Sequence, residues 1–366
     1  MEPWGIAYDP SNGYLYVTDY GSGTVSVIDG ANNTVIATIH VGINPEGVAY
    51  DPSNGYIYVA NSYSSTVSVI NGTTVIANIT VGAVPTGVAY DPSNGYIYVT
   101  DNGISTVSVI NGATNTVIAN IHVGASPMGV AYDSSNGYIY VANFGSGTVS
   151  VIDGGNNTVI ATIHVGSGPV GVAYDPSNGY IYVANIFSDN VSVINGATNT
   201  VIATIPVGYK PVGVAYDPSN GYIYVTNYGS GCVSVINGAT NTVIATIPVG
   251  LWPEGVAYDP SNGYIYVANY FSGTISIIST SVSTSSTSIS SVTTTTTSTS
   301  TSVSTSSTSI SSVTTTTTST STKPTPSPVT TTTTSTPSVV PILVVVVVVV
   351  VVVLIVALLM IKLRKP

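Results

Sequence analysis

The sequence predicts an all-β domain, a seven-bladed β-propeller, followed by a disordered Ser/Thr stalk and one transmembrane helix. Three observations support this. A glycine that opens the pentapeptide GVAYD or GIAYD returns at steps of 42, 40, 42, 42, 42 and 42 residues, which gives seven copies of one unit within residues 1–278. Each unit contains period-two runs of Val, Ile and Tyr, and no segment keeps a helical period. Four-stranded units at this spacing are typical of propeller blades.

The fifth unit illustrates the four strands expected in each blade, near residues 170–175, 180–185, 190–194 and 200–207. The first turn, DPSNG at 175–179, combines a proline that presets φ with a glycine that accepts a positive φ. Residues 195–199 supply the turn between the third and fourth strands. Because neighbouring blades cover both faces of a blade, its strands can be apolar on both sides.

The second strand of each unit carries a further motif. It is YVTN at Tyr224, YVTD at two positions and YVAN at four. These motifs resemble the YVTN-family β-propeller repeat, and the resemblance covers residues 1–278. It implies a surface-layer or cell-surface protein of the kind found in archaea, with relatives among secreted bacterial proteins.

The charge balance argues against nucleic acid as a partner. All fifteen acidic residues lie before residue 279, where Lys210 is the only basic residue, so this part carries a formal charge of −14. Such a surface repels phosphates. The single cysteine, Cys232, excludes an internal disulfide and stands where other units have threonine, so we interpret it as a tolerated substitution.

The composition changes abruptly after residue 278. Residues 279–338 form a Ser/Thr/Pro-rich stretch in which 280–300 and 301–321 are identical, and we expect an O-glycosylated, disordered stalk. Residues 339–361 include an uncharged stretch that begins at Ile342 and ends at Ile361, long enough for one transmembrane helix. The basic tail 362–366 then places the C-terminus in the cytoplasm and the propeller outside the cell.

The start of the sequence conflicts with export and with closure of the ring. It shows no signal peptide, and the seven units contain only six copies of the fourth strand, NTVIATI or its variants. We expect the true start to lie upstream, with a signal peptide and the missing strand. The alternatives are that the seventh blade has three strands or takes a poor fourth strand from the Ser/Thr region.

Catalytic, metal and cofactor sites are not predicted. The first strand is expected to offer no histidine or glutamate at the propeller axis, because it reads GVAYD or GIAYD in all seven units. His40, His122 and His164 occupy one equivalent position in the fourth strand, which is expected to be outermost, so they predict no metal cluster. The turn aspartates are expected to accept hydrogen bonds from their own turns, with calcium as the alternative. They are Asp9, Asp51, Asp91, Asp133, Asp175, Asp217 and Asp259.

Comparison of the units indicates a binding face. The turns between strands one and two and between strands three and four are nearly constant, whereas the other two connections vary and carry aromatic residues. Because strands alternate in direction, the varied connections share one face, which suits contact with protein or glycan. The candidate residues are Trp4, Glu46, Phe187, Tyr209, Lys210, Tyr228, Trp252, Glu254, Tyr270 and Phe271.

Five sequons offer N-glycosylation sites outside the cell: Asn32, Asn71, Asn78, Asn156 and Asn190. The first hypothesis is therefore a single-pass cell-surface propeller that acts in envelope structure, adhesion or recognition, with surface proteins or glycans as partners. The second is an ectoenzyme of the lyase or lactonase type, which would need polar groups or a metal on the axis. The third is an architectural cap without a specific ligand.

Overall fold

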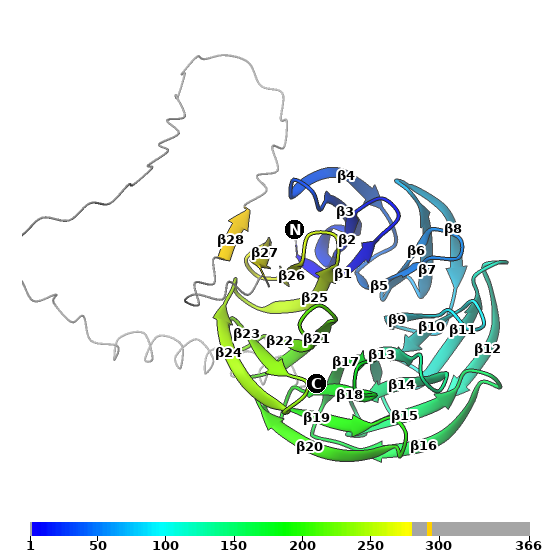
Figure 1. Cartoon of the computed structure of the whole chain (residues 1–366). Helices are drawn as coiled ribbons and strands as arrows, with labels where there is room; N and C mark the ends of the chain where they lie inside the picture. The colour runs from blue at the N-terminus through cyan, green and yellow to red at the C-terminus, as the bar shows by residue number, and fades with distance from the viewer. Residues whose placement is uncertain (1, 280–290, 295–366) are drawn as a thin grey trace, which may run out of the picture. The chain divides into compact units, whose positions relative to one another are not determined.

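The computed structural model describes residues 2–279 and 291–294, which form seven four-stranded antiparallel sheets arranged as blades around an axis (Figure 1). The first strand of each blade contacts the first strands of both neighbours, and blade 7 contacts blade 1, so the ring is closed. Strand order runs outward from the axis in sequence order. The predicted seven-bladed propeller is therefore confirmed, and the four strands of blade 5 lie within two residues of their expected bounds.

Strand bounds repeat from blade to blade. The innermost strands are β1(Pro3–Asp9), β5(Pro45–Asp51), β9(Pro85–Asp91), β13(Pro127–Asp133), β17(Pro169–Asp175), β21(Pro211–Asp217) and β25(Pro253–Asp259). The second strands are β2(Tyr14–Asp19), β6(Tyr56–Asn61), β10(Tyr96–Asp101), β14(Tyr138–Asn143), β18(Tyr180–Asn185), β22(Tyr222–Asn227) and β26(Tyr264–Asn269). The third strands are β3(Thr24–Asp29), β7(Thr66–Asn71), β11(Thr106–Asn111), β15(Thr148–Asp153), β19(Asn190–Asn195), β23(Cys232–Asn237) and β27(Thr274–Ser279). The fourth strands are β4(Thr34–His40), β8(Thr74–Thr80), β12(Thr116–His122), β16(Thr158–His164), β20(Thr200–Pro206), β24(Thr242–Pro248) and β28(Ser291–Thr294), and η1(Tyr20–Ser22) is a short 3-10 turn.

The glycine that opens GVAYD permits the close approach of neighbouring blades. A Cβ added at Gly5 would come against the carbonyl oxygen of Glu46 in blade 2, and one added at Gly255 would come against that of Trp4 in blade 1. The other five equivalents are in the same situation. The register between the first and second strands also shifts at this point in every blade, as between Pro45 and Val48. Only glycine fits where two backbones meet this closely.

Tyrosines of the second strands fasten neighbouring blades on the face of the constant turns. The Tyr58 hydroxyl donates to the Asn115 Oδ1 (2.9 Å) and to the Gly112 carbonyl (3.2 Å), both in the third-to-fourth turn of blade 3. Tyr140 makes the same bonds to Asn199 and Gly196. The tyrosine that opens these two YVAN motifs is thus a structural residue that joins blades.

The apolar core lies between blades rather than within them. For blades 1 to 6, each cluster combines the second, third and fourth strands of one blade with the next blade, as where Val67, Val69 and Ile79 pack with Ile97 and its neighbours. In blades 1 to 6 a fourth-strand isoleucine fills each of these interfaces. These isoleucines are Ile39, Ile79, Ile121, Ile163, Ile205 and Ile247, and all are buried.

The fourth strand of blade 7, β28, comes from the Ser/Thr region. It pairs with β27 so that Ile275 lies opposite Thr294 and Ile277 opposite Val292. Of the alternatives for closure, the structure thus shows the borrowed strand, and the propeller extends past its predicted end at residue 278. The register places Thr294 where the other blades have the buried isoleucine, since Val25 lies opposite Ile39 in blade 1.

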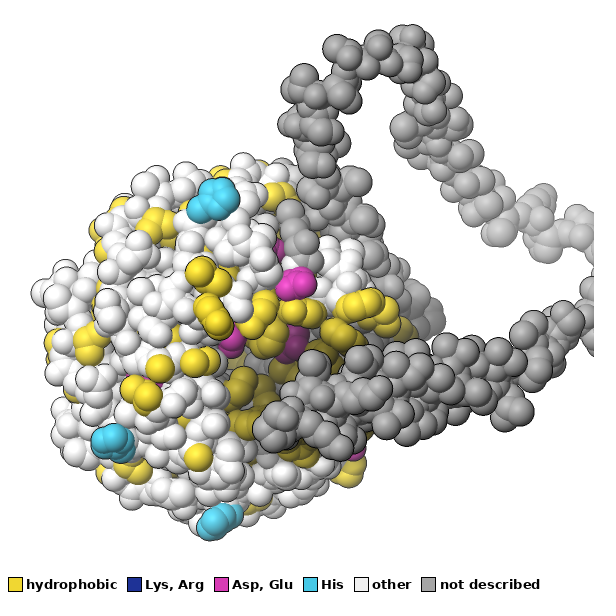
Figure 2. Space-filling view, turned by 180° about the vertical axis from the view of Figure 1, so that it is seen from behind, with side chains coloured by type: hydrophobic (Ala, Val, Ile, Leu, Met, Phe, Trp, Pro, Cys, Tyr) yellow, Lys and Arg dark blue, Asp and Glu magenta, His cyan; other side chains and the backbone are white. Residues whose placement is uncertain are grey.

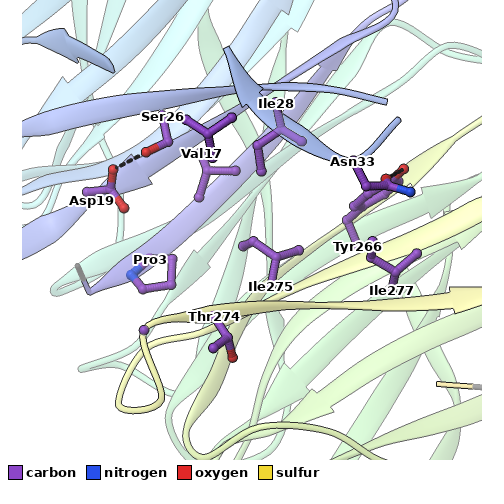
Figure 3. Close-up of a pocket in the computed structure, with 12 residues that line it drawn as sticks. Pro3, Val17, Asp19, Ser26, Ile28, Asn33, Tyr266, Thr274, Ile275 and Ile277 are labelled. Atoms are coloured by element: carbon purple, nitrogen blue, oxygen red, sulfur yellow. Dashed lines mark hydrogen bonds between the residues drawn. The ribbon is translucent and has the colours of Figure 1, made fainter. Parts of the chain in front are cut away.

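A small pocket lies at the interface between blades 7 and 1 (Figure 3). It encloses about 30 Å³, room for about one water molecule, and Val17, Ile28, Ile275 and Ile277 supply apolar walls. The Ser26 hydroxyl donates to the Asp19 carboxylate at its polar edge (2.7 Å). The pocket lies at the interface of the one blade whose fourth strand has threonine, and not isoleucine, at this register position.

The rest of the predicted stalk, the predicted transmembrane helix at 342–361 and the basic tail lie outside the described residues. Within 2–279 and 291–294, no helix is long and apolar enough to cross a bilayer.

Candidate binding site at the mouth of the central cavity

The innermost strands of all seven blades line a central cavity of about 230 Å³. The wall has three levels: the residue before each GVAYD glycine, the glycine itself, and the Ile or Val that follows it. The first level consists of Trp4, Glu46, Thr86, Met128, Val170, Val212 and Glu254. Figure 2 shows hydrophobic side chains gathered around a central hollow, with acidic side chains beside them. The cavity is therefore lined by glycine backbone and mostly apolar side chains, and it carries two carboxyl groups.

The expectation that the first strand offers no glutamate at the axis was wrong. Glu46 lies in β5 and Glu254 in β25, because these strands begin two residues before the glycine rather than at it. Both residues sit at the register shift between the first and second strands. Such irregularities redirect a side chain, here toward the axis. The two glutamates were predicted as rim residues, and the structure instead buries both, with 8% and 5% of their surfaces exposed.

Both carboxyl groups have raised pKa values. Burial raises the pKa of Glu46 to about 7, and a hydrogen bond with Ser62 opposes this only in part. Burial raises the pKa of Glu254 to about 8, and the charge of Glu46 raises it further. Glu254 also adds to the raised pKa of Tyr228, for which burial is the larger cause. At neutral pH the pair thus holds at least one proton for much of the time.

No basic side chain of the described residues compensates these carboxyl groups. Lys210 is the only lysine or arginine there, and its Nζ lies 5.3 Å from the centroid of the Tyr209 ring. It contributes to neither glutamate pKa. No hydrogen-bond donor among residues 2–279 and 291–294 meets the Glu254 carboxyl. A buried acid without a partner is costly to ionise, so this arrangement needs an explanation beyond folding.

Threonines of the preceding blades hold the backbone at both glutamates. Thr18 Oγ1 donates to the Glu46 carbonyl (2.7 Å), and Thr226 Oγ1 donates to the Glu254 carbonyl (2.7 Å). These are the threonines of the YVTD and YVTN motifs in blades 1 and 6. The only other such threonine, Thr100, donates to the carbonyl of Met128 (2.5 Å). The YVAN blades lack this donor.

Six aromatic rings form one continuous cluster beside the carboxyl groups. Trp4 stacks on Tyr20 (5.2 Å between centroids) and meets the Tyr270 ring edge-on (5.5 Å). Trp252 stacks on Tyr228 (5.1 Å) and on Tyr270 (6.2 Å), and contacts Phe271 (4.7 Å). Trp252 and Phe271 remain exposed, at 39% and 62%. We call these six residues the aromatic cluster; they come from blades 1, 6 and 7.

Eight of the predicted binding residues are not glutamates. Five of these eight lie in the aromatic cluster, and the other three lie outside it. Phe187 pairs with Phe144 (5.4 Å), and Tyr209 packs with Lys210; no ring contact joins either pair to the aromatic cluster among the described residues. Tyr20 belongs to the aromatic cluster but is not among the predicted candidates. The signal that could have found it is its position two residues after a YVT threonine, in the connection next to Trp4.

The turn aspartates, the histidines, the cysteine and the sequon asparagines are not part of the aromatic cluster or of the cavity wall. In the DPSNG turn of blade 5, Asp175 accepts bonds from the Ser177 amide and hydroxyl and from Asn178, which leaves little coordination capacity for calcium. The three histidines lie at the exposed ends of outermost strands. Cys232 is buried and free. Of the sequons, Asn32, Asn71, Asn78 and Asn156 are exposed, whereas Asn190 is half-buried and accepts a bond from Asn185.

Comparisons with known proteins agree with the propeller fold. Residues 1–28 match the family model of the NHL repeat. No curated protein matches the chain. Among solved structures, a chain of Kuenenia stuttgartiensis hydrazine synthase aligns with a TM-score of 0.71 and 24% identity, over 77% of this chain and 96% of that one. That likeness concerns the fold. The chain is a seven-bladed β-propeller repeat protein.

Proposed function

We propose that this protein is a membrane-anchored recognition protein of the cell surface, and that it binds protein or glycan through the face of the varied connections. The aromatic cluster is the observation that carries the proposal. Rigid rings exposed beside a cavity supply a large contact area at small entropic cost, which is typical of recognition sites. The apolar stretch from 342 to 361 and the basic tail support the anchored topology, with the propeller outside and the C-terminus in the cytoplasm.

The test is binding of the purified full chain to arrays of glycans and of purified surface proteins. Trp252→Ala removes the ring that touches three others in the aromatic cluster, and we expect it to abolish binding. Phe187→Ala is the matched control, because it removes an aromatic residue of the same face that lies outside the cluster and is more exposed than Trp252 (62% against 39%). Equal binding by wild type and Trp252→Ala would refute the proposal. No binding by the wild type would favour the architectural cap.

The anchored topology needs a separate test. Mass spectrometry of the protein from its native membranes should find glycans between residues 279 and 338, and protease added to intact cells should remove the propeller. An unmodified stalk on a protease-protected propeller would contradict the surface location.

An ectoenzyme is the second candidate, because the axis does carry two polar groups. Carboxyl groups with pKa values of about 7 and about 8 are poised for general acid or base work near neutral pH. Lyase and lactonase substrates that contain uronic acids or lactone rings would test this. Turnover by the wild type that is lost in Glu254→Gln would favour an enzyme over a binding protein.

A further inference from the structure

We propose that the central cavity binds an organic cation, namely a primary ammonium group with an apolar tail, between the carboxyl groups of Glu46 and Glu254. This inference rests on the proposed recognition function and specifies its chemistry. The ammonium group could belong to a free amine or to a lysine or N-terminus of a partner protein. The charge of the site, the shape of the cavity and the aromatic cluster all favour such a ligand.

The two carboxyl groups have no counter-ion among the described residues. The carboxyl group of Glu254 is buried, lines the cavity and has no donor among the described residues, while Glu46 has only Ser62. The two glutamates are the only titratable residues that line the cavity, and Tyr228 is the titratable group next to Glu254. An ammonium ion supplies the charge and the three donors that this pair lacks. The formal charge of −14 also attracts cations to the cavity.

The levels of the cavity wall suit a ligand with one charged end and one apolar end. Beneath the level of the glutamates, the cavity is lined by seven glycines and then by Ile6 and six valines. A ligand can therefore place a hydrocarbon tail among the valines while its charged end stays at the level of the carboxyl groups. A hydrated metal ion would gain nothing from this apolar floor.

The aromatic cluster completes the environment that favours an organic cation. Trp4 lines the cavity in blade 1, between the blades that supply the two glutamates. It stacks on Tyr20, and Tyr228 of the same cluster lies near Glu254. Aromatic faces attract ammonium groups, most strongly where water is excluded. Carboxylates and indole together thus discriminate an amine from a neutral molecule of the same size.

The experiment titrates the full chain with n-butylammonium and follows calorimetric heat and tryptophan fluorescence. Trp4 and Trp252 are the only tryptophans, so the fluorescence reports on this region. Binding is expected at pH 9 and should weaken about tenfold or more at pH 6, where roughly one tenth of the Glu46 carboxyl remains ionised. Glu254→Gln should abolish binding and Glu46→Gln should weaken it. Asp153→Asn, in a turn of the opposite face where four other blades have asparagine, should bind as wild type does.

Neutral n-butanol and calcium are the control ligands. Equal binding of n-butanol, calcium binding in place of the amine, or amine binding that survives Glu254→Gln would each overturn the proposal. A matched lysine peptide separates the two sources: binding of the peptide supports a partner side chain, and binding of n-butylammonium alone supports a free amine. If no amine binds while Trp252→Ala still abolishes array binding, this inference fails and the recognition function stands.

Discussion

Replacement of the two axial carboxyl groups should change how stability depends on pH. Burial raises both pKa values in the folded protein, so the unfolded chain ionises first as pH rises. Their contribution to stability is complete below about pH 4.5 and is lost as pH rises through about 7 for Glu46 and about 8 for Glu254. At about 1.4 kcal/mol per pH unit, ionising Glu46 in the folded state costs about 3 kcal/mol more than in the unfolded chain.

The two contributions do not simply add. Part of the raised pKa of Glu254 comes from the charge of Glu46, so the pair titrates as a coupled unit. We therefore expect the wild type to lose at least about 3 kcal/mol of unfolding free energy between pH 5 and pH 9 on account of the pair. The double variant Glu46→Gln with Glu254→Gln should lose much less, because an amide of the same size does not ionise.

Urea unfolding of the full chain, followed by far-ultraviolet circular dichroism at pH 5, 7 and 9, measures this difference. The buried Asp19 and Asp101 also have raised pKa values, chiefly through burial, and lower stability with rising pH in every variant. The difference between wild type and double variant isolates the axial pair. Asp153→Asn should keep the wild-type dependence. The reasoning is refuted if the double variant loses as much stability as the wild type does.

Three further substitutions test the fold, each by urea unfolding. Thr294→Ile should raise the unfolding free energy by about 0.5–2 kcal/mol, because it places an isoleucine at the register position where blades 1 to 6 have one. The control is Thr315→Ile, at the same position of the identical second copy of the segment, which should leave the unfolding free energy unchanged. An equal gain from Thr315→Ile would contradict the assigned pairing. Gly129→Ala should cost about 1–3 kcal/mol, since its methyl group meets the Val170 carbonyl, and unchanged stability would contradict the close approach of blades. Tyr98→Phe should cost about 1 kcal/mol through its lost bonds to blade 4, and no loss would mean that these bonds do not stabilise the ring.

The sequence predicted the blades well because every blade repeats the same local signals. The valine and isoleucine alternation, the DPSNG or DSSNG turn and the GVAYD or GIAYD glycine recur seven times, so chance agreement is excluded and strand bounds follow closely. Closure of the ring was harder to predict. A serine and threonine segment has no pattern that distinguishes β28 from its neighbours, and its pairing depends on the free edge of β27 rather than on its own propensity.

The candidate site was predicted in part. The varied connections identified the face and most of the aromatic cluster, because strand direction alone decides which loops share a face. The burial of Glu46 and Glu254 was not predicted, since a one-residue change in the assumed start of a strand decides whether a side chain faces solvent or the axis. The sequence did contain a clue. Val170 of blade 5 occupies the position that Glu46 and Glu254 occupy in their blades, and it lies within the first strand expected for blade 5, residues 170–175.

The two glutamates are not requirements of the fold. The five equivalent positions carry Trp, Thr, Met and Val on the same backbone, so an uncharged side chain satisfies the structure there. A buried carboxylate lowers the unfolding free energy above pH 7. The substitutions Glu46→Val and Glu254→Val should therefore each raise it. Both glutamates flank blade 1, which supplies Trp4, and the aromatic cluster gathers on the same side. A ligand that uses them would therefore contact blades 6, 7, 1 and 2 rather than the whole ring, and function would be concentrated where the repeats differ from one another.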